Sequence, residues 1–178
     1  KSLLNWLIIP GIPLSILTAV YTAYLFAQAK ARDMWQNPLL PPHLLVQALL
    51  LGSAILLPAA IYVGSINLTI RTTQVHQQLT WLLAMSGLIH LLMIWGEVSL
   101  THPTAHARLA IWEMVSGRYK TDFWLAIVLS ALGTLFPWLS LVGVVGSSIG
   151  VAAAPFAIIG LMLYENAYVQ AGQPVPLA

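Results

Sequence analysis

The chain has 178 residues, of which 59% are hydrophobic and only 7% are charged. A soluble domain typically has about 25% charged residues, so the composition predicts an integral membrane protein and excludes an ordinary soluble domain. The formal net charge is only +2 and arises from loop residues, so it indicates membrane topology and no nucleic-acid partner. The chain has no cysteine, which excludes disulfides and thiolate-held iron-sulfur clusters within it.

Five apolar runs are long enough to cross a lipid bilayer, and they predict a single all-α domain of transmembrane helices. The predicted spans cover about residues 3–28, 44–67, 79–100, 123–141 and 149–168. All but the third contain proline, which predicts kinked helices whose freed carbonyls are satisfied by neighbours or water. The glycine and serine cluster at residues 143–148 predicts a tight turn.

The basic residues are distributed unevenly between the two predicted sides of the membrane. Five of the seven fall in the first and third loops, at Lys30, Arg32, Arg108, Arg118 and Lys120. Lys1 and Arg71 fall on the other side. The positive-inside rule therefore places the loop at residues 101–122 and the C-terminus in the cytoplasm.

The third span carries two ionisable residues, His90 and Glu97. They are seven positions apart and so lie on one helical face, about 10 Å apart along the axis. Ionisable groups at such depth are costly and indicate a function by default. We expect a proton pathway through His90 and Glu97, with Ser86 on the same face and Ser130 and Thr134 of the fourth span as neighbours. A structural hydrogen bond between helices is the alternative.

The loop at residues 101–122 holds the densest group of ionisable side chains. Alternation of apolar and polar residues over Ala107–Ser116 predicts a short interfacial helix with Trp112 at the headgroup level. We expect a partner to dock on His102, His106, Arg108, Glu113 and Arg118. A solvated connector with a positive-inside bias is the alternative.

Haem and metal chemistry are disfavoured by the histidine positions. His90 is the only histidine deep in a predicted span, because His43 falls at a helix start, whereas a membrane b-type haem needs facing axial ligands. His102 and His106 have the i,i+4 spacing of a metal pair, but Pro103 falls between them and no carboxylate or thiolate accompanies them in a helical metal motif. We therefore expect neither haem nor metal in this chain.

Several segments, in order, resemble the NrfD/polysulfide reductase membrane subunits. The first are Tyr21–Phe26 and Ala29–Pro41, with the sequences YTAYLF and AKARDMWQNPLLP. They are followed by Gly117-Arg118-Tyr119, Phe123-Trp124, Gly133, Pro137, Ala171-Gly172-Gln173 and Val175-Pro176-Leu177. The loop His102-Pro103-Thr104, with Met114 and Gly117 to Tyr119, looks closest to the C and F subunits of alternative complex III.

This resemblance implies a haem-free, quinone-reactive subunit of a respiratory complex in a prokaryotic cytoplasmic membrane. Such a subunit exchanges electrons with an iron-sulfur partner, which is often bound to a molybdopterin oxidoreductase or to multihaem cytochromes. It is not catalytic alone and works beside other membrane subunits. The five spans look like the family's C-terminal half, whereas the best-known quinone pocket lies in the N-terminal helix bundle. The quinone or quinol is therefore expected in a shared site or in the other half, and no quinone ligand carries over.

Two other functions stay open at this point. A secondary transporter fragment would show inverted repeats with matching broken helices, and no internal repeat is visible. A passive membrane anchor would use His90 and Glu97 only to hydrogen-bond helices together.

Overall fold

The structure is a computed structural model that describes residues 2–30, 32–66 and 72–174. These residues form helices and no strands, which confirms the predicted all-α fold. The elements are α1 (Ser2–Ala27), η1 (Asp33–Gln36), α2 (Leu40–Ile66), α3 (Thr72–Ser99), α4 (Ala105–Val115), α5 (Lys120–Leu141), α6 (Ser147–Ala152) and α7 (Ala154–Gly172). Five segments of this described chain are long and apolar enough to cross a membrane, and α6 and α7 together make the fifth.

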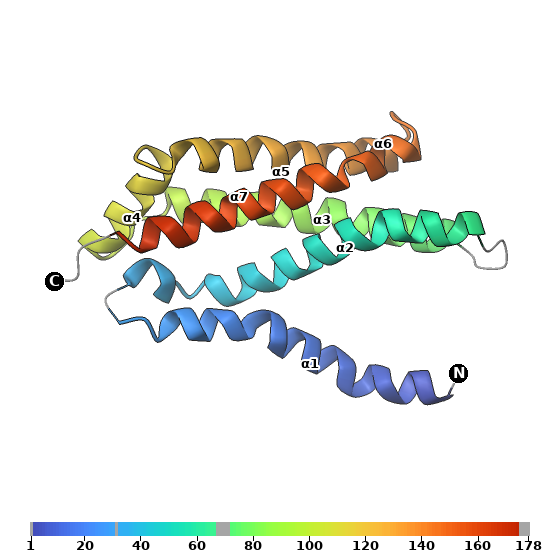
Figure 1. The fold of residues 1–178 in the computed structure, drawn as a ribbon, viewed down its shortest axis with the longest axis horizontal. Coiled ribbons are helices and arrows are strands. Elements are labelled where there is room, and N and C mark those ends of the chain that lie inside the picture. Colours follow the sequence, from blue (N-terminus) through green and yellow to red (C-terminus); the bar gives the residue numbers. More distant parts are fainter. Residues whose placement is uncertain (1, 31, 67–71, 175–178) are drawn as a thin grey trace.

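Four helices, α2, α3, α5 and α7, pack side by side as a bundle, and α1 lies against α2 and η1 (Figure 1). One end of the bundle, here called the loop end, carries η1, α4 and the last turn of α7 (Figure 1). The other end, here called the far end, carries α6, the end of α2 and the start of α3 (Figure 1). The first and third loops and the end of α7 therefore share one end, as alternating spans require. Lys1 and Arg71 lie outside the described residues.

The tightest helix packing joins α5 to α7 and depends on two glycines. A Cβ added at Gly133 would lie 2.6 Å from the backbone nitrogen of Ala157, and one at Gly160 would lie 2.6 Å from Ser130 Oγ. Because neither glycine has a side chain, the two backbones approach more closely than larger residues would allow. This close contact makes α5 and α7 the most extensively packed pair of helices in the described chain.

The turns between the last three helices differ in one respect from the sequence prediction. Gly143 has a φ of 77°, a left-handed conformation that suits the predicted tight turn. The fifth span is broken at Ala153, whereas the sequence predicted only a kink at Pro155. Pro155 lies in the first turn of α7, where its missing N–H has no helical acceptor, so the proline begins a new helix.

The interfacial helix forms as α4, two residues earlier than Ala107. Thr104 caps its first turn by accepting a hydrogen bond from the Ala107 N–H at 3.2 Å. One face of α4 is buried against α5, α7 and η1, while Trp112 on the other face is exposed. The third loop is therefore folded onto the bundle rather than extended into solvent.

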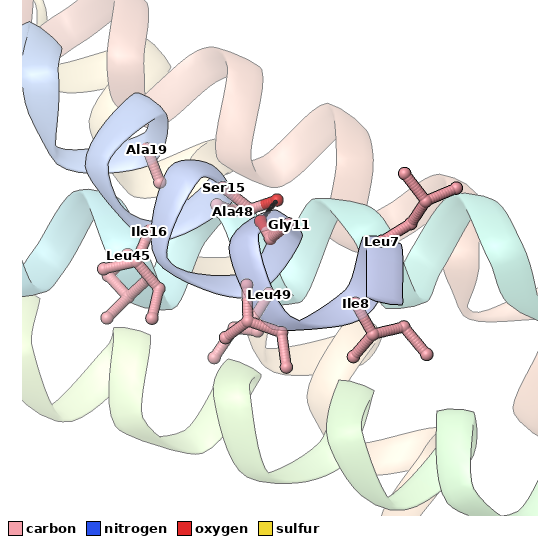
Figure 2. A pocket seen from close by; sticks show the side chains of 10 residues that line it. Leu7, Ile8, Gly11, Ser15, Ile16, Ala19, Leu45, Ala48 and Leu49 are labelled. Atoms are coloured by element: carbon pink, nitrogen blue, oxygen red, sulfur yellow. Dashed lines mark hydrogen bonds between the residues drawn. The ribbon is translucent and has the colours of Figure 1, made fainter. Parts of the chain in front are cut away.

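An apolar groove of about 670 Å³ runs between α1 and α2 (Figure 2). It is lined by Leu7, Ile8, Gly11, Ile12, Ser15, Ile16, Ala19, Leu45, Ala48 and Leu49. The Ser15 hydroxyl donates to the Gly11 carbonyl at 2.8 Å, so even this polar side chain is bonded to its own helix. The groove therefore presents hydrocarbon to its surroundings.

Candidate functional site

A cluster of buried polar side chains lies in the half of the bundle nearest the loop end. His43 comes from the first turn of α2, His90 and Glu97 from α3, and Tyr164 from α7. None of the four side chains is more than 4% exposed. Buried polar groups persist in a membrane helix bundle only when they are paired or used, so this cluster is the candidate functional site.

His43 connects the two residues that the sequence singled out. Its Nε2 atom lies 2.8 Å from His90 Nδ1, a direct hydrogen bond between two imidazoles. Its Nδ1 atom lies 4.0 Å from Glu97 Oε2, within ion-pair range but longer than a hydrogen bond. Glu97, His43 and His90 therefore form a carboxylate–imidazole–imidazole chain across α2 and α3.

Both carboxylate oxygens of Glu97 accept hydrogen bonds from fixed donors. Asn37 Nδ2 donates to Oε1 at 2.9 Å, and the Tyr164 hydroxyl donates to Oε2 at 3.0 Å. The Glu97 backbone carbonyl lies 2.8 Å from His102 Nε2. Because the two side-chain donors come from different parts of the chain, they hold the carboxylate in one orientation toward His43.

Aromatic packing holds the imidazoles in place. The ring centroids of His43 and His90 are 5.0 Å apart, and Tyr164 lies 5.5 Å from the first and 5.2 Å from the second. Tyr164 thus contacts all three members of the chain through either its ring or its hydroxyl. Its packing restricts rotation of both imidazoles within the bundle.

The loop that supplies Asn37 is fastened to the end of α7. The Arg32 guanidinium donates to the Gly172 carbonyl at 3.0 Å and to the Gln173 carbonyl. The Tyr168 hydroxyl donates to the Met34 carbonyl at 3.0 Å. A cation at a helix C-terminus is favourable, because it satisfies terminal carbonyls and opposes the helix dipole. This contact sets the position of the loop, and hence of Asn37.

The three hydroxyls predicted to neighbour His90 have different surroundings. Ser86 donates to the Leu82 carbonyl at 2.6 Å, and Thr134 donates to the Ser130 carbonyl at 2.7 Å, so both bond to their own helices. Ser130 Oγ is buried with no hydrogen-bond partner. Within the part of the chain that the structure describes, His43 joins His90 to Glu97, and none of the three hydroxyls bonds to either residue.

The five residues predicted as a docking surface all lie at the loop end but are not equally available. Arg108 and Arg118 are exposed, whereas His102, His106 and Glu113 are half-buried. Arg108 donates to the His102 carbonyl at 3.0 Å, and Glu113 Oε2 accepts from the Arg118 backbone N–H at 3.1 Å. Several of these groups therefore also shape the folded loop.

Sequence reasoning missed part of the site. The sequence analysis treated His43 as a helix-start residue, yet it is 2% exposed and bonded to His90. Asn37 and Tyr164 were also missed, as was Glu165, a half-buried carboxylate on α7 that hydrogen-bonds Gln47. Glu165 carried a usable signal, because it is a carboxylate inside a predicted span.

His43 and His90 contact each other directly through a hydrogen bond. A metal–imidazole bond is about 2 Å long, so an ion between two imidazole nitrogens separates them by about 4 Å. The observed 2.8 Å between His43 Nε2 and His90 Nδ1 leaves no room for an iron ion between these atoms.

A family model described as polysulphide reductase, NrfD, matches residues 1–176. Comparisons with the curated proteins and with the solved structures gave no match. Members of this family are membrane subunits of quinone-linked oxidoreductases that partner with iron-sulfur and molybdopterin-type subunits. The match covers nearly the whole chain and agrees with its five apolar helices, and the chain therefore belongs to the NrfD polysulphide reductase family.

Proposed function

We propose that this chain is a membrane subunit of a quinone-linked respiratory complex and that Glu97, His43 and His90 carry protons between the loop end and the bundle interior. The observation that carries this proposal is the buried chain itself, in which His43 lies between a carboxylate and a second imidazole. An imidazole accepts a proton on one nitrogen and releases one from the other, so it can relay a proton without moving far.

Glu97 is the end of this chain nearest the loops. It lies in the last turn of α3, next to the start of the third loop, and His102 of that loop bonds its backbone carbonyl. A proton taken up near His102 reaches Glu97 first, then His43 across the 4.0 Å gap, then His90. The gap closes by a small side-chain movement or by one water molecule. By the positive-inside rule, this end faces the cytoplasm of a prokaryotic cell.

The loop end is also the proposed docking face for the iron-sulfur partner. Its exposed basic side chains are Lys30, Arg108, Arg118 and Lys120. These charges suit a partner surface that carries carboxylates, because opposite charges steer association and fix orientation. The resemblance to alternative complex III would make the other partners a molybdopterin-type or multihaem cytochrome subunit and further membrane subunits.

The described grooves do not fit the headgroup of a quinone. The α1/α2 groove is lined by hydrocarbon, and its one hydroxyl, Ser15, bonds to its own helix. A second groove, of about 340 Å³ between α3 and α5, is also almost wholly apolar, and the indole N–H of its Trp124 donates to the Val115 carbonyl. Quinone carbonyls require hydrogen-bond donors for orientation. We therefore propose that the headgroup binds outside these two grooves.

Glu97→Gln in the assembled complex tests the relay. This change keeps the shape of the side chain but removes its titratable proton, and we expect proton-coupled quinol turnover to fall by about 10²-fold or more. Asp122→Asn is the matched control, because Asp122 is a half-buried carboxylate in the first turn of α5, outside both the buried chain and the predicted docking residues. Unchanged turnover and proton uptake in Glu97→Gln proteoliposomes would favour the passive anchor and overturn the relay.

Co-purification tests the assembly. A mild-detergent preparation of the tagged chain is expected to retain an iron-sulfur subunit, detected by its metal content and paramagnetic resonance. Charge reversal at Arg108 and Arg118 together should weaken this retention at physiological salt more than reversal at Lys30 alone. Retention of the iron-sulfur subunit at wild-type levels after the double reversal would contradict the proposed docking face.

A further inference from the structure

The groove between α3 and α5 is an open apolar surface on the outside of the bundle. It has a volume of about 340 Å³, and its lining comes from residues 91–98 of α3 and 123–131 of α5. The lining side chains are all aliphatic or aromatic, and Trp95 and Trp124 among them are 72% and 54% exposed. Within a membrane span, such a surface is suited to contact with hydrocarbon.

The register of the two helices shows which way the groove runs. A Cβ added at Gly87 of α3 would overlap the Thr134 side chain of α5, so these two residues face each other. Because the helices are antiparallel neighbours, Leu91 then lies level with Ala131, and Val98 lies level with Trp124. The groove therefore extends from the loop end toward the middle of the bundle.

Lys120 continues the groove-lining face of α5 to the loop end. At 3.6 residues per turn, Lys120, Trp124, Ile127 and Ala131 lie within about 60° of one another around the helix. Lys120 is exposed, and no other described residue pairs with its ammonium group. The rise from Lys120 to Ala131 is about 16 Å, and half the hydrocarbon core of a bilayer is about 15 Å thick. The groove and its cation therefore match one leaflet in length.

The first turn of α5 adds to the positive potential beside Lys120. Tyr119 at the N-cap makes no side-chain hydrogen bond to this turn, and free N–H groups at a helix start carry partial positive charge. Asp122, the carboxylate of the same turn, lies about 200° around the helix from Lys120. Asn166 of α7 donates to Asp122 at 3.0 Å. The carboxylate therefore faces away from the groove, and the end of the groove favours an anion.

We propose that the groove binds one anionic phospholipid, with an acyl chain between α3 and α5 and its phosphate at the Lys120 ammonium group. The apolar lining suits the chain, and the cation at the loop end suits the phosphate. Trp124 is held at this level because its indole N–H donates to the Val115 carbonyl at 3.1 Å, and indole rings favour the membrane interface. The site uses none of the residues of the proposed relay, so either proposal can fail without the other.

Photo-cross-linking of the assembled complex in proteoliposomes tests the charge preference. Trace phosphatidylglycerol or phosphatidylcholine, each with the same diazirine-bearing acyl chain, is added to otherwise identical membranes, and cross-links are mapped by mass spectrometry. We expect about five-fold more labelling of the groove by phosphatidylglycerol, as for one lysine contact near the membrane surface. Lys120→Gln should lower this ratio toward one. Lys30→Gln is the matched control and should keep it, because Lys30 is an exposed loop-end lysine that follows α1.

A second pair of variants tests the place of the acyl chain. Ala131→Phe puts a ring at the inner end of the groove and should reduce labelling by both lipids. Val128→Phe is its control and should leave labelling unchanged, because Val128 is exposed on α5 outside the groove lining.

Three results would overturn the proposal. The first is equal labelling by the two lipids in the wild-type complex, which would indicate ordinary solvation by the bilayer. The second is an unchanged ratio in Lys120→Gln. The third is a groove that neither lipid labels, which would indicate that a helix of another subunit covers it.

Discussion

The two halves of the bundle have interiors of different character. In the half nearest the loop end, an apolar cluster that includes Ile94, Met114 and Phe123 surrounds a polar group, in which His43 bonds to His90 and Tyr164 bonds to Glu97 across different helices. In the far half, the core is an apolar cluster of Leu50, Ala54, Leu57, Leu83, Ala154, Ala157 and Leu161. The buried hydroxyls there, Ser53 and Thr80, bond only to their own helices.

This difference indicates that different interactions stabilise the two halves of the bundle. The half nearest the loop end, here called the polar half, combines apolar packing with matched donors and acceptors, while the far half depends on close packing of side chains and backbone. The chain from Glu97 ends at His90, and the buried hydroxyls beyond that level each donate to a carbonyl of their own helix, at Ser53, Thr80, Ser86 and Thr134. In the proposed function, protons therefore enter and leave this bundle from the loop end only.

The largest expected effect comes from cutting the polar chain at its centre. His43→Phe keeps an aromatic ring against Tyr164 but removes both nitrogens, so proton-coupled turnover of the complex should fall by about 10²-fold or more. Leu57→Met in the far half is the control, because a volume-conserving apolar change should leave the rate near wild type. Equal rates for the two variants would show that the polar half has no special role in turnover.

Packing in the far half can be tested with a matched pair of glycines. In Gly133→Ala the new Cβ would lie 2.6 Å from the Ala157 backbone nitrogen, so α5 and α7 must separate. We expect a loss of about 1–3 kcal/mol in unfolding free energy, measured by titration with denaturing detergent. Gly52→Ala gains the same methyl group in open space and should not destabilise the protein. The opposite ranking would refute the close α5–α7 contact.

Weakening the attachment of the first loop to the end of α7 should have a smaller effect on stability and turnover. Arg32→Gln removes the charge that Arg32 places on the Gly172 and Gln173 carbonyls, at a partly exposed site. We expect about 1 kcal/mol of destabilisation, together with a few-fold slower turnover because Asn37 is less well fixed against Glu97. Turnover that stays at the wild-type rate while stability falls would separate the loop attachment from the site.

The smallest effect on activity is expected from single cysteines that are introduced to determine the membrane topology. The chain has no cysteine, so Ser116→Cys and Ser147→Cys each introduce one exposed thiol, at the loop end and the far end respectively. Membrane-impermeant maleimide should label them from opposite sides of sealed vesicles, with turnover unchanged. Labelling of both from one side would contradict the assignment of the two ends.

The sequence predicted the bundle and two members of the site because both leave local signals. Long apolar runs define the helices, and His90 and Glu97 stand out as ionisable residues within one of them. His43 left no such signal, because a histidine at a helix start ordinarily lies near water. Its burial depends on α7 packing Tyr164 over it, and contacts between residues so distant along the chain are not visible in local patterns.

The hydrogen bonding of buried serines also could not be predicted from local sequence. Ser86 and Ser130 have similar burial, yet one bonds to its own helix and the other faces Gly160 of α7. The residue type and helix position do not distinguish them. What differs is the neighbouring helix, since the missing side chain at Gly160 allows the Ser130 hydroxyl to point outward from α5.

The hydrogen bond between His43 and His90 couples the tautomers of the two rings. Only one of the facing nitrogens can carry the shared hydrogen, so the tautomer of one imidazole determines that of the other. A proton that hopped through the pair would leave each hydrogen on the opposite nitrogen. Both rings would then have to turn over before a second hop in the same direction, and the packed Tyr164 ring opposes that turn. The pair is therefore better suited to storing and returning single protons than to conducting a steady current.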